Sequence, residues 1–262
     1  MHYIKHLFFS LLLFILSSCS NSKSSEAVEN KKDSTFINNS PAIKDKSSKD
    51  SLTPVSLLQN ELPENVSFKG TSFYGAYKWY DKNGWNLLVL STNTTSAKNK
   101  EIDEVENSAE LFARQYNLKD PAKPVVTWDM YDAELKCIFD ITCAFMNTEI
   151  TDLDSNGTKE TFIAYKTSCR SDVSPAIMKV IMHEGKKKYA LRGKMIFIIP
   201  DIPDTLFPQT REIDLSKISK TEIEKTMFRD WGCYENANDF KTAPPVFLNF
   251  AKQFWRDNSF EN

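Results

Sequence analysis

The sequence has no excess of basic residues. Lys and Arg number 33 and Asp and Glu number 35 among its 262 residues, so the formal net charge is −2. Binding to the phosphate backbone of nucleic acid requires a surplus of lysine and arginine. The composition therefore excludes a general nucleic-acid binder, and we expect no nucleic-acid partner.

Histidine is also scarce, and this limits the metal chemistry. Two of the three histidines, His2 and His6, lie in an N-terminal segment that we expect to be removed, so only His183 remains. One histidine cannot form a multi-histidine metal site. His183 falls at the end of a predicted strand beside a lysine-rich turn, where we expect it to be exposed. No GxSxG or HExxH motif accompanies it.

The N-terminal apolar run is too short for a lasting membrane span. Leu7–Leu16 comprises ten residues, which rise about 15 Å as a helix, roughly half the hydrocarbon core. With Lys5 before it, the run predicts a signal peptide over residues 1–18. Its ending, Leu16-Ser17-Ser18-Cys19, resembles the lipobox of bacterial lipoproteins. That resemblance implies a diacylglycerol on Cys19, and Ser20 implies sorting to the outer membrane. The alternative is an ordinary secretory signal with a chance cysteine.

A change of composition follows Cys19. Residues 19–60 are rich in Ser, Asn, Lys, Asp and Glu and poor in apolar residues. Such a segment cannot bury enough surface to offset its ordering entropy. We therefore predict a lipidated cysteine and disordered tether over 19–60, and a β-rich globular domain over 61–262.

The globular part is predicted to consist of strands separated by short turns. Ser67–Tyr80 and Trp85–Ser91 flank the turn Asp81-Lys82-Asn83-Gly84 and predict a hairpin. Further predicted strands are 109–116, 125–131, 136–150, 161–167, 176–183 and 189–199. About eight strands with short turns predict a mainly β fold, an antiparallel meander, sandwich or barrel.

One helix is predicted at the C-terminal end. Thr242 is its expected N-cap, and Pro244 and Pro245 fall in its first turn. The apolar residues from Val246 to Phe254 recur at helical spacing and predict a face that packs on the core.

The cysteines are compatible with export to an oxidising compartment. Cys137, Cys143, Cys169 and Cys233 are even in number and contain no CxxC pair, which disfavours zinc. If the turn at residues 152–157 closes a hairpin, Cys143 lies opposite Lys166, and no two cysteines are directly opposed. Either Cys137 or Cys143 then reaches Cys169 only through a bulge or local shift. We favour a disulfide between Cys137 and Cys169, with free buried thiols as the alternative.

The segment from Asp152 to Glu160 has the spacing of a calcium-binding loop. Oxygen-bearing side chains occur at Asp152, Asp154, Asn156, Thr158 and Glu160, with Gly157 at the sixth position. The loop is not an EF-hand, because its twelfth position is Ile163. It resembles the calcium-binding hairpin loops of integrin-type repeat proteins, which implies Ca²⁺ as a cofactor. The alternative is a plain turn held by hydrogen bonds from side chains to the backbone.

Two enzymatic interpretations are weaker. Asp-Leu-Asp is also the DxD signature of glycosyltransferases, but those enzymes need a nucleotide-binding α/β domain, which this strand pattern does not predict. A hydrolase would need a pair of carboxylates. The candidates Asp140, Asp152, Asp154, Asp172 and Glu184 show no spacing that selects two of them.

A family resemblance is carried by three strings. They are TDLDSNGTKETFIAYKTSCRSDVSPAIMKVIMHEGKKKYALRG at 151–193, WDMYD at 128–132 and KTAPPVFLNFAKQFW at 241–255. The chain resembles Bacteroidota lipoproteins described as surface polysaccharide biosynthesis proteins. The resemblance is close over 125–193 and 240–256 and loose over 66–124. It implies a role in lipopolysaccharide or another surface glycan, and it supplies no catalytic residues.

These observations favour binding over catalysis. We expect an outer-membrane lipoprotein, attached to the membrane by its lipid, whose partner is an envelope glycan or the glycan-assembly machinery. The alternative is a periplasmic or surface carbohydrate hydrolase with a carboxylate site. Arg170 and Asp172 are candidates to orient a carbohydrate, or else they pair with each other and cap their loop. The candidate aromatic platform is Tyr74, Tyr77, Trp79 and Trp85, for which core packing is the alternative.

Overall fold

The computed structural model of the chain describes residues 53–198, 207 and 210–261. The predicted signal peptide, Cys19 and most of the predicted tether lie outside these residues. In the described part, no helix is both long and apolar enough to cross a membrane.

The described residues form mostly strands. They are β1 (Val55–Leu57), β2 (Ser72–Asp81), β3 (Gly84–Asn99), β4 (Glu104–Asn117), β5 (Val125–Cys137), β6 (Asp140–Thr151), β7 (Glu160–Arg170), β8 (Ile177–Glu184), β9 (Lys187–Lys194), β10 (Ile196–Phe197) and β11 (Phe260–Glu261). The helices are α1 (Lys220–Lys225) and α2 (Pro245–Asn258), with short 3-10 helices η1 (Gln59–Glu61), η3 (Leu215–Lys217) and η4 (Asn238–Phe240).

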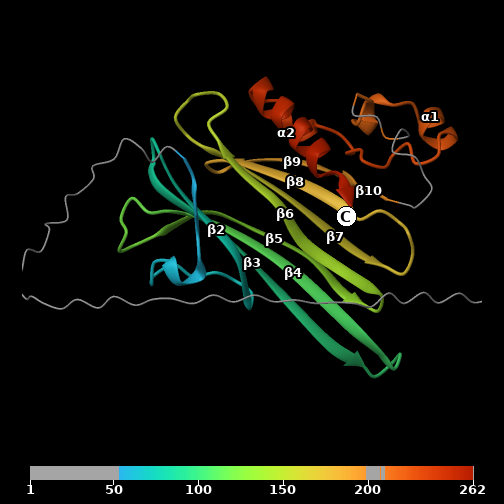
Figure 1. Cartoon of the computed structure of the whole chain (residues 1–262), viewed down its shortest axis with the longest axis horizontal. Coiled ribbons are helices and arrows are strands. Elements are labelled where there is room, and N and C mark those ends of the chain that lie inside the picture. The colour runs from blue at the N-terminus through green and yellow to red at the C-terminus, as the bar shows by residue number, and fades with distance from the viewer. Residues whose placement is uncertain (1–52, 199–206, 208–209, 262) are drawn as a thin grey trace, which may run out of the picture. The chain divides into compact units, whose positions relative to one another are not determined.

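Two antiparallel meanders make up most of the fold, as the sequence predicts, and β10 pairs with β11 in a small parallel sheet. One sheet has the order β1-β2-β3-β4-β5 and the other the order β6-β7-β8-β9 (Figure 1), and neither closes into a barrel. The predicted strand 136–150 is divided, because β5 continues to Cys137 and β6 starts at Asp140. Lys136, with φ 57°, has a left-handed backbone just before this break.

The sheets pack face to face as a sandwich. Their shared core takes side chains from both sheets: Trp79, Leu88, Leu90, Leu111, Ala113, Trp128, Met130, Phe145, Ile163, Tyr165, Ile181 and Ala190. Burial of large aromatic and branched side chains in such a core supplies most of the favourable free energy that offsets the conformational entropy lost on folding.

Each sheet is also covered on its outer face. Helix α2 lies over the four-stranded sheet (Figure 1), where Phe247, Phe254 and Trp255 join a buried cluster with strand residues such as Phe162. The predicted core-facing stripe of this helix is therefore confirmed. Its N-cap is Pro244, so the predicted N-cap at Thr242 is wrong: the helix begins at Pro245, a residue suited to the first helical position.

The five-stranded sheet is covered by the segment that joins β1 to β2, together with Leu57 at the end of β1. Leu57, Leu62 and Val66 pack on a buried cluster that includes Leu87 and Tyr116. Strand β1 pairs with β2, so the folded unit starts within the predicted tether and before residue 61. The pairing with β2 and the single packed side chain of Leu57 account for this difference, because a short strand needs little apolar surface to join an existing sheet.

The disulfide joins the two sheets. Cys137 of β5 is bonded to Cys169 of β7, which confirms the predicted pair. A bulge in β6 between Phe145 and Asn147 shifts the register, so Cys143 lies opposite Thr167 and not Lys166. Cys143 and Cys233 are free thiols. Burial raises the pKa of Cys143 to about 12, which keeps this thiol protonated at neutral pH.

Candidate functional site

Two hairpin turns from different sheets meet at one end of the sandwich. The backbone N–H of Lys82, in the β2–β3 turn, donates to the carbonyl of Gly157 in the β6–β7 loop at 2.8 Å. The Lys82 ammonium donates to the Asn156 carbonyl at 2.8 Å, and the N–H of Lys159 donates to Asp81 at 3.3 Å. The β6–β7 loop therefore holds the β2–β3 turn in place.

Three of the five predicted metal ligands converge in this loop. Asp152, Asp154 and Glu160 each offer a carboxylate oxygen, and these three oxygens lie within 4.8 Å of one another. In the part of the chain that the structure describes, this is the single such group of acidic, histidine or cysteine side chains. Oxygen ligands at this spacing suit a hard cation such as Ca²⁺.

Glu160 differs from an ordinary surface carboxylate. Its side chain is fully buried. One oxygen accepts hydrogen bonds from the Thr151 hydroxyl at 2.8 Å and the Leu153 N–H at 3.0 Å. The other, Oε1, has no hydrogen-bond partner among the described residues. Burial raises the pKa of Glu160 because it disfavours the charged form. A buried carboxylate with a free oxygen is a suitable cation ligand.

The other two predicted ligands are used differently. The Asn156 side-chain oxygen accepts from the Thr158 N–H at 2.8 Å, and its amide nitrogen donates to Asp154 at 2.9 Å and to Glu184 at 2.5 Å. The Thr158 hydroxyl accepts from Asn83 at 3.3 Å. Gly157 has φ +81°, as expected for the sharp turn. Asn156 and Thr158 therefore connect the loop to neighbouring turns.

A groove lies beside the same β2–β3 turn. One part, with a volume of about 640 Å³, is lined by Tyr80, Lys82, Asn83, Gly84, Trp85, Leu118, Lys119 and Pro121. A smaller part of about 100 Å³ adds Pro63 and Lys78 and shares Trp85, Leu118 and Pro121. We call the two parts together the Trp85 groove.

The aromatic surface of this groove comes from two strands. Tyr80 of β2 lies directly opposite Trp85 of β3, and their rings meet edge to face with centroids 5.4 Å apart. Tyr80 is 47% exposed and Trp85 is 36% exposed. Hydrogen bonds fix the floor, since the Leu118 N–H donates to the Trp85 carbonyl at 2.7 Å and Asn117 donates to the Asn83 carbonyl at 3.1 Å.

The predicted aromatic platform is only partly correct. Trp85 lines the groove, but Trp79 is fully buried between the sheets and Tyr77 packs against the same core. Tyr74 is half-exposed and contacts Phe145 on the other sheet. Tyr80 was not among the predicted residues. The register of the hairpin closed by Asp81–Gly84 places Tyr80 opposite Trp85, and this signal was available in the sequence.

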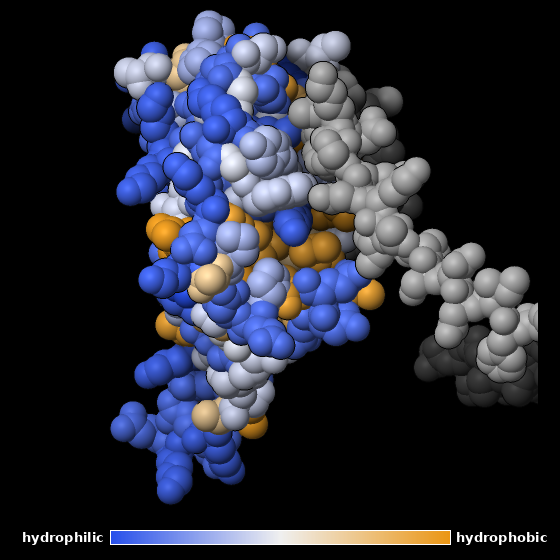
Figure 2. Space-filling view, turned by 90° about the vertical axis from the view of Figure 1, so that its left-hand side faces the viewer, coloured by the Kyte–Doolittle hydropathy of each residue, from blue (hydrophilic) through white to orange (hydrophobic). Residues whose placement is uncertain are grey.

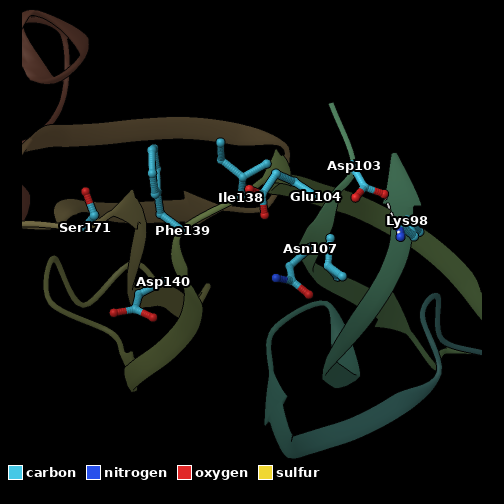
Figure 3. A pocket seen from close by; sticks show the side chains of 9 residues that line it. Lys98, Asp103, Glu104, Asn107, Ile138, Phe139, Asp140 and Ser171 are labelled. Atoms are coloured by element: carbon cyan, nitrogen blue, oxygen red, sulfur yellow. Dashed lines mark ion pairs between the residues drawn. The ribbon is translucent and has the colours of Figure 1, made fainter. Parts of the chain in front are cut away.

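Of the candidate carboxylates of a hydrolase, Asp152 and Asp154 come together in the group with Glu160, and Asp140 and Asp172 are not part of that group. Asp140 lines an open pocket of about 640 Å³ at the tip of the long β3–β4 hairpin, together with Asp103, Glu104 and Phe139. Figure 3 shows Asp103 facing Lys98, with which it forms an ion pair at 2.7 Å, and Asp140 well apart from that pair. Asp172 is exposed and accepts from the Ser174 N–H at 2.9 Å.

Two further residues lie elsewhere than the sequence predicts. His183 is buried, not exposed, because it stacks on Trp128 of the other sheet with centroids 3.9 Å apart. The two terminal guanidinium nitrogens of Arg170 donate to the two carboxylate oxygens of Glu261, Nη2 at 2.5 Å and Nη1 at 3.0 Å. Arg170 does not pair with Asp172. Asp172 does cap its own loop, as expected.

The surface around these features is mostly polar. Figure 2 shows one face as largely hydrophilic, with hydrophobic residues gathered near its middle. The candidate site is thus an aromatic groove next to an acidic hairpin loop of a β-sandwich. No family model, curated protein or solved structure matches this chain.

Proposed function

We propose that this protein is an outer-membrane lipoprotein that binds a surface polysaccharide and supports its assembly by binding, without catalysing a step. The Trp85 groove carries this proposal. Exposed Tyr and Trp rings offer flat apolar faces with a polar edge, and sugar rings present matching C–H faces. A few polar groups around such rings fix the orientation of the ligand.

The sequence adds support that is independent of the groove. The lipobox resemblance implies that a lipid on Cys19 attaches the chain to a membrane. The Ser- and Asn-rich segment after Cys19 would then serve as a tether that lets the domain reach away from the lipid surface. The family resemblance indicates a surface glycan such as lipopolysaccharide or capsule. Together these features favour a glycan-binding envelope protein over a carbohydrate hydrolase.

We also propose that the β6–β7 loop holds Ca²⁺ through Asp152, Asp154 and Glu160. The support is the convergence of the three carboxylates and the unpaired, fully buried Oε1 of Glu160. The ion would act structurally, because the loop is hydrogen-bonded to the turn that forms one side of the Trp85 groove.

Binding of the bacterium's own polysaccharide tests the main proposal. A soluble form starting at Ser20 should bind surface polysaccharide extracted from the producing strain. We expect Trp85→Ala to weaken binding by roughly five-fold to a hundred-fold, if a stacked sugar ring contributes about 1–3 kcal/mol, as a stacked nucleobase does. Tyr131→Ala is the matched control, because Tyr131 is a half-exposed tyrosine that does not line the groove. Equal binding by wild type and Trp85→Ala would contradict the proposal.

A further inference from the structure

We infer that the polysaccharide recognised by the Trp85 groove is anionic and that Lys78 and Lys119 bind its negative groups, with Lys82 adding to the positive charge of the lining. This inference rests on the proposed function and specifies the class of ligand. It follows from the charges that line the groove and from the partners of each charge.

The groove carries positive charge without negative charge. Three lysines line it, and none of its described lining residues is acidic. Two carboxylates next to lining residues are held by backbone N–H groups: Asp81 is buried and accepts from the Asn83 N–H at 2.7 Å, and Asp120 accepts from the Ala122 N–H at 3.0 Å. The lining therefore has an unbalanced positive charge.

No carboxylate in the described residues neutralises these lysines. The Lys78 ammonium lies 4.8 Å from the centroid of the Trp85 ring. The Lys82 ammonium contacts the neutral oxygens of Asn156, at 2.8 and 3.3 Å. Lys119 is exposed. Lysines elsewhere in the described chain do form ion pairs, as Lys179 does with Asp132 at 2.5 Å and Lys194 with Asp230 at 2.6 Å.

This arrangement selects a particular kind of sugar. The Tyr80 and Trp85 rings stack on sugar faces whatever their charge, so they supply affinity without selecting for charge. An ammonium group is a compact point charge that donates hydrogen bonds to carboxylate or phosphate oxygens approaching from several directions. A neutral glycan in the groove would shield the lysines from water without supplying counter-charges, which is unfavourable. The groove is therefore complementary to a glycan that bears carboxylate or phosphate groups.

Chemical neutralisation of the ligand tests the inference. Extracted surface polysaccharide is used in three forms: native, carboxyl-reduced, and dephosphorylated with hydrogen fluoride. Binding of the soluble protein is measured by calorimetry at low and high salt. We expect the native form to bind most tightly, with affinity that falls as salt rises, and one of the two treatments to weaken binding. The treatment that does so identifies the anionic group.

Lysine variants complete the test. Lys78→Gln with Lys119→Gln should weaken binding of the native form by roughly two- to twenty-five-fold, since each exposed pair contributes about 1.4- to five-fold. The same variant should bind the neutralised form as wild type does. Lys100→Gln with Lys136→Gln, exposed lysines outside the groove, is the control. Thermal unfolding of each variant checks that it is folded.

The outcomes separate the two proposals. If the treated polysaccharides bind as tightly as the native form and Trp85→Ala weakens all of them, the groove binds glycan but the inference of an anionic ligand is wrong. If no form binds, or Trp85→Ala has no effect, the proposed function itself is wrong.

Discussion

At the scale of single residues, His183 shows most clearly how the sandwich changes side-chain chemistry. It lies on β8 and stacks on Trp128 of β5, so it is enclosed between the two sheets. Burial, together with a smaller effect of the nearby charge of Lys188, lowers its pKa to about 3. Its Nδ1 atom has no hydrogen-bond partner among the described residues. His183 is therefore a neutral core residue.

This burial predicts a dependence of stability on pH. The unfolded chain binds a proton at His183 below its ordinary pKa of 6.5, whereas the folded chain binds it only near pH 3. Protonation of His183 therefore costs the fold no stability above pH 6.5. As the pH drops from 6.5 toward 3, the free energy of unfolding falls because only the unfolded chain takes up the proton. Between pH 6.5 and 4 we expect wild type to lose about 3 kcal/mol more than His183→Phe, which keeps a ring on Trp128 but cannot titrate. Urea unfolding at several pH values measures this difference, and parallel curves would contradict it.

The sequence predicts the strand that contains His183 but not the environment of its side chain. Met178, Val180 and Met182 point toward α2, and Ile181 points toward the other sheet. Both faces of β8 are buried, so alternation along one strand does not reveal which polar position is enclosed. The partner, Trp128, lies on a different sheet, and single-strand patterns carry no information about contacts between sheets.

At the scale of elements, the disulfide connects strands that belong to different sheets. Cys137 and Cys169 are separated by 32 residues. Closing a loop of that length stabilises the fold by about 3–4 kcal/mol in the chain-entropy model. We expect Cys137→Ser with Cys169→Ser to lower the free energy of unfolding by that amount, and Cys143→Ser to change it by less than about 1 kcal/mol. Denaturant unfolding without reductant gives both values, and equal stability of the paired variant and wild type would contradict the prediction.

The β6–β7 loop leads to a prediction about calcium. A ligand that binds only the folded state stabilises it by about 1.5–3 kcal/mol at ten to a hundred times its dissociation constant. With a millimolar or submillimolar constant, typical of extracellular calcium modules, 10 mM Ca²⁺ should raise the melting temperature by roughly 3–10 °C.

The control for the calcium experiment is a carboxylate outside the β6–β7 loop. Asp152→Asn with Asp154→Asn should abolish the shift, and Asp140→Asn should retain it, because Asp140 is exposed and lies outside the convergent trio. If Ca²⁺ leaves the melting temperature of wild type unchanged, the loop is the plain turn that the sequence also allows.

The elements themselves were largely predictable, and their exact pairing was not. Turn residues such as Asp81–Gly84 and alternating apolar residues predict the strands and the antiparallel meander. The bulge between Phe145 and Asn147 has no turn residue to indicate it, yet it sets the register of Cys143. In the loop, spacing predicts five ligands, but the β2–β3 turn engages Asn156 and Thr158. A contact with a distant hairpin decides which oxygens face one another.

At the scale of the whole molecule, the proposed function combines two separate requirements. The groove must bind glycan, and the chain must be held at the membrane where surface polysaccharide is assembled. The first depends on residues such as Trp85, which the structure describes, and the second on Cys19, which lies outside the described residues. Each requirement can be removed without the other.

Removing the lipid anchor and the groove one at a time should show that surface polysaccharide assembly needs both. A deletion strain should show altered lipopolysaccharide or capsule on gels of its surface glycans, and wild type should restore the profile. Cys19→Ala should lose labelling by an alkyne analogue of palmitate, because the cysteine sulfur carries the diacylglycerol. It should not restore the profile, since a soluble copy is diluted away from the membrane. Trp85→Ala should still be labelled but should also fail to restore the glycan profile.

Equal labelling of Cys19→Ala and wild type would contradict the lipid anchor. An unchanged glycan profile in the deletion strain would contradict the role in polysaccharide assembly.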